Sequence, residues 1–379
     1  MKLAILSTQY PSEENHYAHT FVHRRSKYFI ESGEEVTVFV PSEEFKQYIY
    51  EEVRVIMAPS SYISKLLSDF DVVYFHLLNL YPFSSRNGYE IYKTVIKNNI
   101  KSAFYIHGSE VQTMASRNFD FKYSLYEFAR ILYKDYYFIY NMRRIVRRLI
   151  NNKCQFITPS NWMLCEARNE LKISHLNAVI IPNGIDTDLF NSFNKSFNNC
   201  KMLMIRPLHS YKYAVDIGIE IMRHLPEKFT LDIYGKGKYK NKYIDLINSY
   251  NLSERVKFVG EHIPNHEMPN IINKYDYFLS PTRMDAQGVS MCEALSCGRV
   301  VISSNNTAIP EFINDGFNGI LADTPESAAN KIINIEDDKL AKDRMMLEAR
   351  ESAKKIAFAQ TLKKELLLLR SLHNGEITC

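Results

Sequence analysis

Short apolar segments of strand length alternate with segments of helical periodicity along almost the whole chain, and the alternation runs twice. In the first half, helix candidates such as Phe21–Ser32, which Gly33 can end, and Glu90–Asn98 separate the apolar segments. The strand candidates of this half are Leu3–Ser7, Glu35–Val40, Asp71–His76, Ala103–His107, Gln155–Pro159 and Ala178–Ile181. Such alternation is typical of a parallel sheet with right-handed crossovers and helices on both faces. The first half therefore predicts a doubly wound α/β domain.

The second half repeats this organisation after an Asn/Ser-rich stretch, residues 191–200, which we interpret as a linker. Its strand candidates are Met202–Ile205, Thr230–Tyr234, Val256–Val259, Tyr277–Pro281, Val300–Ser303 and Gly319–Leu321. Its helix candidates are Val215–His224, Tyr239–Tyr250, Met268–Asn273 and Ser290–Ser296, and residues 339–372 read as helix to the end.

A length of 379 residues also favours two domains. We predict an N-terminal Rossmann-like domain over residues 1–190 and a C-terminal one over residues 201–379. The amphipathic terminal helix must dock, either on its own domain or back on the N-terminal domain. Because open sheets of this kind bind ligands at the carboxyl ends of their strands, the site is expected in a cleft between the two domains.

The charge and cysteine content exclude several classes of protein. Lys plus Arg outnumber Asp plus Glu by 22 to 20 in residues 1–190 and by 25 to 23 in the remainder, so neither half resembles a nucleic-acid-binding arm. The six cysteines form no zinc-like spacing and fit reduced thiols. The N-terminus reads as a first strand rather than a signal peptide, and no stretch approaches the about 18 apolar residues of a membrane span. We expect a cytoplasmic protein whose membrane contact, if any, is peripheral at the inner face of the cell membrane.

The window Pro281–Gly298 is the strongest candidate for a phosphate site. It follows a strand, passes a glycine turn at Gly288 and enters a helix, which aims backbone N–H groups at an anion. Asp285 and Glu293 flank this turn, eight positions apart. The alternative is structural, since Ser290 and Glu293 have the spacing of a capping box.

Two cations, Arg206 and Lys212, follow the first strand of the second half and would lie at its cleft end. Together they suit a diphosphate, whereas each alone would more often be a solvated surface charge. Gly235-Lys-Gly237 also follows a strand, but without a third glycine it is a weak dinucleotide-binding signal and favours an ordinary turn.

Motifs along most of the chain point to one family. They are Tyr105-Ile-His-Gly-Ser-Glu110, Pro182-Asn-Gly-Ile-Asp-Thr-Asp-Leu-Phe190, Asp285-Ala-Gln-Gly-Val-Ser-Met-Cys-Glu-Ala-Leu-Ser-Cys-Gly298, Ala308-Ile-Pro-Glu-Phe-Ile313 and Asp315-Gly-Phe-Asn-Gly-Ile-Leu321. In this order they resemble the motifs of the GT-B retaining glycosyltransferases of family 4, including the acidic pair E-x7-E. The resemblance implies two Rossmann-like domains that face an interdomain cleft, the N-terminal one for a saccharide or lipid-linked acceptor and the C-terminal one for a nucleotide-diphosphate-sugar donor.

The same resemblance implies a role for each matching residue. The basic pair that grips the donor diphosphate matches Arg206 and Lys212, and the turn whose amides hold phosphate and sugar matches Gly288, Val289 and Ser290. Glu293 matches the acidic residue on the ribose, and the catalytic positions match His107 and Asp285. Asp285 stands where the family usually has the longer Glu, which bears on its reach to the sugar.

The resemblance also implies retention at the anomeric carbon, with the leaving phosphate helping to deprotonate the acceptor. Fixed cations and helix N–H groups can stabilise that leaving group, so neither a metal nor another cofactor is expected. The Asp-x-Asp pairs at Asp69–Asp71 and Asp186–Asp188 read as structural. His16, His19 and His23 share one segment but have no acidic or cysteine partner for a metal site.

Residues 117–153 carry nine Lys/Arg against three Asp/Glu. Their apolar positions fall on one broad helical stripe of Leu125, Phe128, Leu132, Ile139, Met142, Ile145 and Leu149. The segment could lie on an anionic membrane that displays a lipid-linked acceptor. The alternative is a packed helix with a solvated basic face.

The leading hypothesis is a retaining, metal-independent hexosyltransferase of bacterial surface polysaccharide or glycolipid biosynthesis. One alternative is a sugar-nucleotide epimerase of the same architecture, which would need no second substrate. The other is a non-catalytic subunit that binds nucleotide or carbohydrate. The sequence does not specify the base, the sugar, the acceptor or the linkage.

Overall fold

A computed structural model describes residues 1–15, 18–76, 78–117, 119–120, 124–191, 200–261 and 263–376. Contacts divide the chain into two units. The N-terminal unit comprises Met1–Asn118, Lys122–Pro182 and Thr361–Cys379, and the C-terminal unit comprises Phe119–Phe121 and Asn183–Gln360. The predicted linker falls almost wholly on residues 192–199, which lie outside the described part of the chain.

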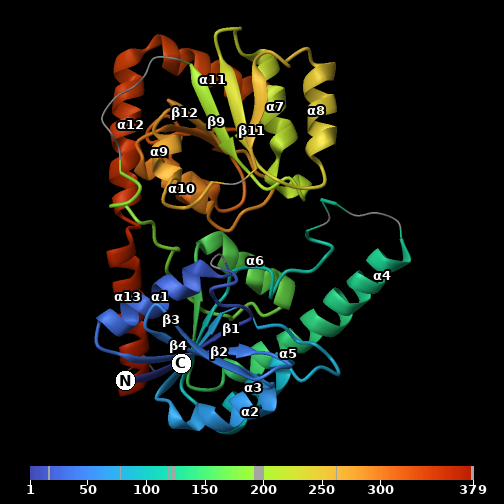
Figure 1. The fold of residues 1–379 in the computed structure, drawn as a ribbon, viewed down its shortest axis with the longest axis vertical. Helices are drawn as coiled ribbons and strands as arrows, with labels where there is room; N and C mark the ends of the chain where they lie inside the picture. The colour runs from blue at the N-terminus through green and yellow to red at the C-terminus, as the bar shows by residue number, and fades with distance from the viewer. Residues whose placement is uncertain are drawn as a thin grey trace. The chain divides into compact units, whose positions relative to one another are not determined.

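The described part of the N-terminal unit alternates strands with helices over most of its length, as the hydrophobic pattern predicts, but three strands between residues 35 and 58 follow one another without a helix (Figure 1). Its strands are β1 (Lys2–Ser7), β2 (Glu35–Pro41), β3 (Lys46–Tyr50), β4 (Val53–Ala58), β5 (Val72–His76), β6 (Ser102–Tyr105), β7 (Cys154–Thr158) and β8 (Val179–Ile180). Its helical elements are α1 (Thr20–Glu31), α2 (Ser60–Leu66), η1 (Leu67–Asp69), α3 (Gly88–Lys97), α4 (Leu125–Ile131), the π-helix η2 (Leu132–Phe138), α5 (Ile139–Leu149), α6 (Asn161–Leu171) and most of α13 (Phe358–Asn374).

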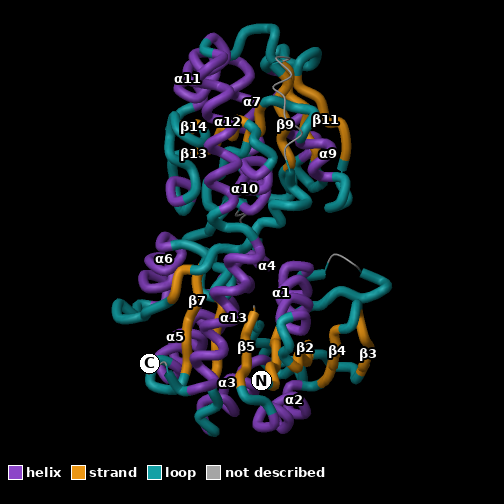
Figure 2. The backbone as a smooth tube through the Cα atoms, turned by 90° about the vertical axis from the view of Figure 1, so that its left-hand side faces the viewer, coloured by secondary structure: helices purple, strands orange, loops and turns teal. Residues whose placement is uncertain are grey.

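Within the described residues, these eight strands form one sheet in the order β3-β4-β2-β1-β5-β6-β7-β8. All neighbouring strands are parallel except the β3–β4 hairpin at one edge. The central strands are buried along nearly their whole length because helices cover both faces of the sheet (Figure 2). The order places the ends of β1, β5 and β6 side by side at the carboxyl edge.

Helix α13 returns to the N-terminal unit and packs on its core. Leu366, Leu369 and Leu372 belong to the same buried cluster as Leu3, Ile5 and Tyr74 of the sheet. Residues 339–372 do not form the single helix that the sequence predicts. They form α12 (Lys339–Lys354) and α13, because the chain breaks at Lys355–Ala357 to bond with Ile185.

The described part of the C-terminal unit is a second open α/β sheet. Its strands are β9 (Lys201–Ile205), β10 (Thr230–Tyr234), β11 (Val256–Gly260), β12 (Tyr277–Leu279), β13 (Val300–Ser304) and β14 (Ile320–Ala322), in the order β11-β10-β9-β12-β13-β14 and all parallel. Its helical elements are η3 (Tyr211–Tyr213), α7 (Val215–His224), α8 (Lys240–Ser249), α9 (Met268–Ile272), α10 (Val289–Ser296), η4 (Ile309–Glu311), α11 (Pro325–Asp337) and α12.

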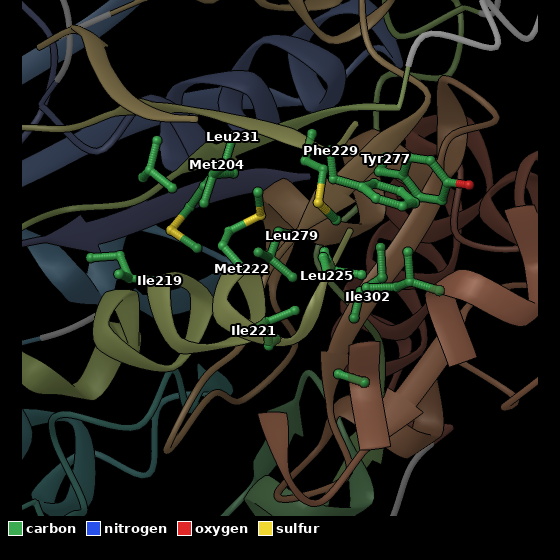
Figure 3. Close-up of a cluster of buried hydrophobic side chains, with 14 of the residues drawn as sticks. Met204, Ile219, Ile221, Met222, Leu225, Phe229, Leu231, Tyr277, Leu279 and Ile302 are labelled. Atoms are coloured by element: carbon green, nitrogen blue, oxygen red, sulfur yellow. The ribbon is translucent and has the colours of Figure 1, made fainter. Parts of the chain in front are cut away.

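One core of this unit packs α7 against the sheet. Figure 3 shows Met204 and Leu279 from the strands meeting Ile219 and Met222 from α7, and all four are fully buried. Close packing extends to Gly218 of α7, where a Cβ would lie 2.0 Å from the terminal methyl of Met204. This packing fixes the carboxyl ends of β9 and β12, from which the predicted donor-site residues emerge.

The boundary between the units lies between Pro182 and Asn183, earlier than the predicted end of the first domain at residue 190. Ile185 and Phe190 are buried in a second core of the C-terminal unit. The Ser296 hydroxyl donates a hydrogen bond to the Phe190 carbonyl at 2.7 Å. These contacts place residues 183–190 in the C-terminal unit.

Candidate functional site

Arg206 leaves the carboxyl end of β9 and is buried, with 5% of its surface exposed. Its Nη2 donates to the carbonyls of Ser280 (2.9 Å) and Pro281 (3.3 Å) and to the Ser280 hydroxyl. Its Nε has no hydrogen-bond partner, and no carboxylate forms an ion pair with it, among the described residues. Burial lowers the pKa of Arg206, while the charge of Asp285 opposes this effect. A buried guanidinium without a paired carboxylate is costly unless an anion binds there.

Lys212 lies in the short helical turn η3, and neighbouring contacts hold that turn in place. The Arg283 guanidinium forms a two-pronged ion pair with Asp216, at 2.9 and 2.6 Å, and donates to the Tyr211 carbonyl at 2.7 Å. The Lys212 carbonyl accepts a hydrogen bond from the Arg283 backbone N–H at 2.9 Å. No sequence pattern predicts the Arg283–Asp216 pair, which fixes the backbone that carries Lys212.

The loop from β12 to α10 is closed by Asp285. Its Oδ1 accepts hydrogen bonds from the backbone N–H groups of Gln287 (3.2 Å) and Gly288 (2.9 Å). Gly288 has φ 75°, a left-handed conformation that favours glycine, and it immediately precedes the first residue of the helix, Val289. The carboxylate that was predicted to contact the sugar therefore shapes the turn that was predicted to bind phosphate.

The structure excludes the capping-box alternative. Helix α10 begins at Val289 and its N-cap residue is Gly288, so Ser290 lies inside the first turn instead of preceding it and cannot be the cap of a capping box. The first N–H groups of a helix have no intrahelical acceptor. The N-terminus at Val289 and Ser290 is therefore open to an anion, and Glu293, which is 8% exposed, follows one turn later.

Gln287 is a further residue of this turn that the sequence did not single out. It is 2% exposed. Its side chain accepts from the Asn183 backbone N–H at 2.7 Å and donates to the Asn183 carbonyl at 2.8 Å. The Pro-Asn-Gly motif and the phosphate turn are thus joined by a glutamine that satisfies both polar groups of one backbone residue.

Gly235 and Gly237 are required by close backbone packing. A Cβ on Gly235 would lie 2.2 Å from the Arg206 carbonyl oxygen, and one on Gly237 would lie 2.3 Å from the Leu208 carbonyl carbon. The Leu208 backbone bonds to this loop through the Lys236 carbonyl (2.9 Å) and the Tyr239 N–H (3.0 Å). These glycines form an ordinary turn that supports the segment after Arg206.

His107 follows β6 in the N-terminal unit and is partly buried. Its backbone N–H donates to the Glu110 carboxylate, which also accepts from the Gly108 N–H at 3.0 Å. Its ring stacks on Tyr105 with centroids 4.4 Å apart and packs on Phe21 at 4.8 Å. Burial and the positive charges of Arg25 and His19 lower the pKa of His107 well below its ordinary value. The imidazole is therefore neutral at physiological pH.

His76 is a partner of His107 that the sequence did not reveal. It ends β5, the strand next to β6, and is fully buried. Its Nδ1 lies 3.1 Å from Nε2 of His107. The sequence did contain one clue to this pair, since both histidines end strand candidates, and these strands prove to be neighbours in the sheet.

His19, His23 and one aspartate of each Asp-x-Asp pair make contacts within the protein. His19 bonds to the Ser7 hydroxyl at 2.9 Å, and His23 bonds to the Tyr10 hydroxyl at 2.9 Å. Asp71 accepts from the Lys2 N–H at 2.7 Å, and Asp186 accepts from the Leu189 N–H at 3.0 Å. His16 lies outside the described residues. Within the part of the chain that is described, no three His, Cys, Asp or Glu side chains come together as metal ligands.

Within the described ranges, no helix combines the length and apolar character needed to cross a bilayer. The cysteines at positions 154, 165, 200, 292 and 297 are free thiols, and Cys379 lies outside the described residues.

Two family models match the chain in succession. The model described as Glycosyltransferase Family 4 matches residues 18–189, and that described as Glycosyl transferases group 1 matches residues 187–355. The boundary between them falls close to the boundary between the two structural units. Together they cover most of the chain, from residue 18 to residue 355.

Similar proteins agree with these matches. An uncharacterised glycosyltransferase of Methanocaldococcus jannaschii is 24% identical over 208 residues, which cover 53% of this chain and 57% of the relative. The amylovoran biosynthesis glycosyltransferase AmsK of Erwinia amylovora is 31% identical over 133 residues, covering 33% of this chain and 32% of AmsK. The matched regions thus span from about a third to somewhat over half of these relatives' lengths.

The fold matches over the whole chain. The structure of Anabaena HepE in complex with UDP superposes with a TM-score of 0.74 and 14% identity, covering 98% of this chain and 99% of HepE. At this identity the likeness establishes the fold, and it agrees with the two parallel sheets described above. The successive family matches and this full-length likeness show that the chain belongs to the family 4 glycosyltransferases and has the GT-B fold.

Proposed function

We propose that this protein transfers a hexose-type sugar from a nucleotide-diphosphate-sugar to a saccharide or lipid-linked saccharide acceptor. The observation that carries the proposal is Arg206, a buried guanidinium at the end of a central strand with a free Nε and no paired carboxylate among the described residues. A diphosphate supplies the missing negative charge and accepts hydrogen bonds from guanidinium groups. Family membership and the likeness to a UDP-bound structure support the same assignment.

The remaining donor contacts follow from the geometry of the C-terminal unit. Lys212 adds a second cation, and the N-terminus of α10, which follows the turn at Gly288, offers the backbone N–H groups of Val289 and Ser290 to phosphate and sugar. In this proposal Glu293 binds the ribose hydroxyls and Asp285 approaches the transferred sugar. Asp285 can do this through Oδ2, since Oδ1 is engaged by the loop.

The chemistry proposed for these residues is electrostatic. Breaking the bond from sugar to phosphate leaves negative charge on the nucleotide diphosphate, and cations held in fixed positions stabilise that charge without reorganising. Arg206 and Lys212 perform this role, so the proposed reaction needs no metal or other cofactor. We propose that the sugar is transferred with retention and that His107 contacts the sugar or the reacting centre.

A biological setting is proposed from the relatives. AmsK is named for the biosynthesis of amylovoran. We therefore place the reaction in the assembly of a bacterial surface polysaccharide or glycolipid on the cytoplasmic side of the cell membrane.

The test of this function is a binding screen followed by a transfer assay. Isothermal titration of the full chain with UDP, GDP, ADP and NAD should show selective binding of one nucleoside diphosphate. The matching nucleotide-sugar should then release its diphosphate only when an acceptor is present. Release or isomerisation without acceptor would favour the epimerase alternative, binding without turnover would favour a non-catalytic subunit, and binding of NAD alone would refute the proposal.

A membrane-bound acceptor is supported by the surface of α4 and η2. Residues of the predicted stripe separate into two groups in the structure. Ile139, Met142, Ile145 and Leu149 are buried, whereas Leu125, Phe128 and Leu132 are 90%, 50% and 60% exposed. The exposed group lies beside Tyr126, Tyr136 and Tyr140, which are also exposed, and Arg130, Arg144, Arg147 and Arg148 project to solvent from the same helical segment.

We propose that this apolar and basic surface rests on an anionic lipid layer. Exposed aliphatic and aromatic side chains gain free energy by entering the interfacial region, and arginines are attracted to anionic headgroups. The packed-helix alternative applies to α5, whose apolar residues are buried, but it does not account for the exposed residues of α4 and η2.

Replacing Leu125 and Leu132 with Ser is therefore expected to weaken binding to vesicles that contain phosphatidylglycerol. A leucine that enters the lipid fully contributes about 1.5–3 kcal/mol, so losing two that enter it only partly should weaken binding about ten-fold. Vesicle sedimentation measures this. The matched control is Ile49→Ser, because Ile49 is 74% exposed but lies on strand β3. Equal binding to anionic and neutral vesicles, or an equal loss in the control, would contradict the proposal.

A further inference from the structure

His76, which ends β5, and His107, which follows β6, form a hydrogen-bonded pair in which one nitrogen of His76 has no partner among the described residues. His76 is fully buried, and its Nδ1 faces Nε2 of His107 at 3.1 Å. Its other nitrogen, Nε2, is buried and has no partner among the described residues. One proton is shared between the facing nitrogens, and its position decides which nitrogen of His107 carries a proton.

Both rings lie in an aromatic enclosure that keeps them neutral. Tyr74 packs on His76 with centroids 4.4 Å apart, Tyr105 stacks on both rings, and Phe21 lies against His107. The Arg25 guanidinium stands over the Tyr105 ring at 4.8 Å and belongs to the same buried group. Burial lowers the pKa of His76 well below its ordinary value, and the facing His107 ring and the charge of Arg25 lower it further.

A neutral pair has two possible arrangements. If His107 donates from Nε2, then His76 must carry its own proton on Nε2, where no acceptor exists within the described residues. If His76 donates from Nδ1, its Nε2 is only an unused lone pair. Orphaned buried N–H groups are rare in folded proteins, and an under-satisfied acceptor is tolerated more often. The second arrangement is therefore favoured.

From this geometry we infer that His76 is a positioning residue that fixes His107 in the tautomer with its proton on Nδ1. Nδ1 of His107 has no hydrogen-bond partner among the described residues and is not one of the buried polar atoms without a partner. It therefore faces solvent as an N–H donor.

The consequence concerns the ligand of His107 and rests on the proposed function. A neutral imidazole that presents N–H can donate a hydrogen bond to a lone pair on a sugar hydroxyl or on the reacting oxygen. It cannot accept a proton through the same nitrogen. His107 then donates a hydrogen bond from Nδ1 to an oxygen of the substrate. It does not act as a general base through that nitrogen.

The tautomer can be read directly by long-range ¹H–¹⁵N correlation NMR of the ligand-free, ¹⁵N-histidine-labelled protein, with His107→Asn assigning the signals. We expect the wild-type spectrum to show the Nδ1–H form of His107. In His76→Leu that preference should be lost, and in His76→Asn it should be retained, since the amide nitrogen can take the place of Nδ1–H. Circular dichroism compares the folding of these variants.

A wild-type spectrum with the proton on Nε2 of His107 would overturn the inference, whether or not either His76 variant folds. An unchanged tautomer in a folded His76→Leu protein would overturn it as well. Since no nucleotide or acceptor is present, neither result depends on the transferase proposal. Failure of the titration with nucleoside diphosphates would refute the function and leave the tautomer result intact.

Discussion

Replacing Glu365 with Gln is expected to destabilise the N-terminal unit by about 3–5 kcal/mol, because it leaves the buried Arg25 charge without its counter-ion. The Arg25 and Glu365 side chains are 2% and 0% exposed, and the guanidinium donates to both carboxylate oxygens at 2.9–3.1 Å. The Tyr74 hydroxyl donates to the same carboxylate at 2.9 Å. Burial alone would lower the pKa of Arg25, but Glu365 raises it above its ordinary value.

The measurement is urea unfolding followed by tryptophan fluorescence. Trp162 is the single tryptophan of the chain and lies in α6 of the N-terminal unit, so its emission reports on the unit that Glu365 stabilises. The matched control on the same helix is Arg370→Gln. Arg370 pairs with Glu34, but its side chain is 46% exposed and Glu34 keeps the N-terminal ammonium as a partner, so the cost should be about 0–1 kcal/mol.

A double variant separates the charge effect from a packing effect. Arg25→Met combined with Glu365→Met removes both charges and should recover most of the loss, because a buried ion pair is often replaceable by apolar side chains of similar volume. If Glu365→Gln and Arg370→Gln shift the unfolding midpoint equally, the buried pair is not what holds α13 to this unit.

The hydrophobic pattern was sufficient to predict both sheets, and the places where it failed have tertiary causes. The β3–β4 hairpin was not predicted because its two-residue turn is Glu51-Glu52. Both residues have positive φ, 43° and 73°, a conformation that Asn-Gly or Asp-Gly usually signals in a sequence. The break between α12 and α13 has no Gly or Pro either. It arises from hydrogen bonds to Ile185, which is distant in sequence.

Some residues of the candidate site could be identified from local sequence, and others depend on contacts with distant segments. Residues at strand ends and in the glycine turn, such as Arg206 and Gly288, could be selected from local spacing alone. Gln287, Asp216 and His76 could not, since each acts through a partner from another segment. The position of His76 requires the strand order, which brings β5 next to β6. The helix start at Val289 depends on the Asp285 side chain, which accepts hydrogen bonds from two backbone N–H groups of the turn before it.

The second large effect is expected at Arg206. Arg206→Gln removes the cation but keeps a side chain that can still donate to the Ser280 carbonyl. Hydrogen bonds to charged groups contribute about 1.5–3 kcal/mol, so affinity for the preferred nucleoside diphosphate should fall on the order of 10- to 100-fold. Isothermal titration of the folded variant measures the change in Kd, and thermal unfolding establishes that the fold is kept.

Arg255→Gln is the matched control for this experiment. Arg255, which is half-buried, likewise donates to backbone carbonyls, those of Met222, Leu225 and Pro226 at 2.9–3.1 Å. It directly precedes β11, whereas Arg206 directly follows β9 in the same parallel sheet, so the two lie at opposite strand ends. If only the Arg206 variant loses affinity, the nucleoside diphosphate binds at the carboxyl edge of the C-terminal sheet. Equal losses in both variants would point to general destabilisation, and undiminished affinity in Arg206→Gln would show that the diphosphate binds elsewhere.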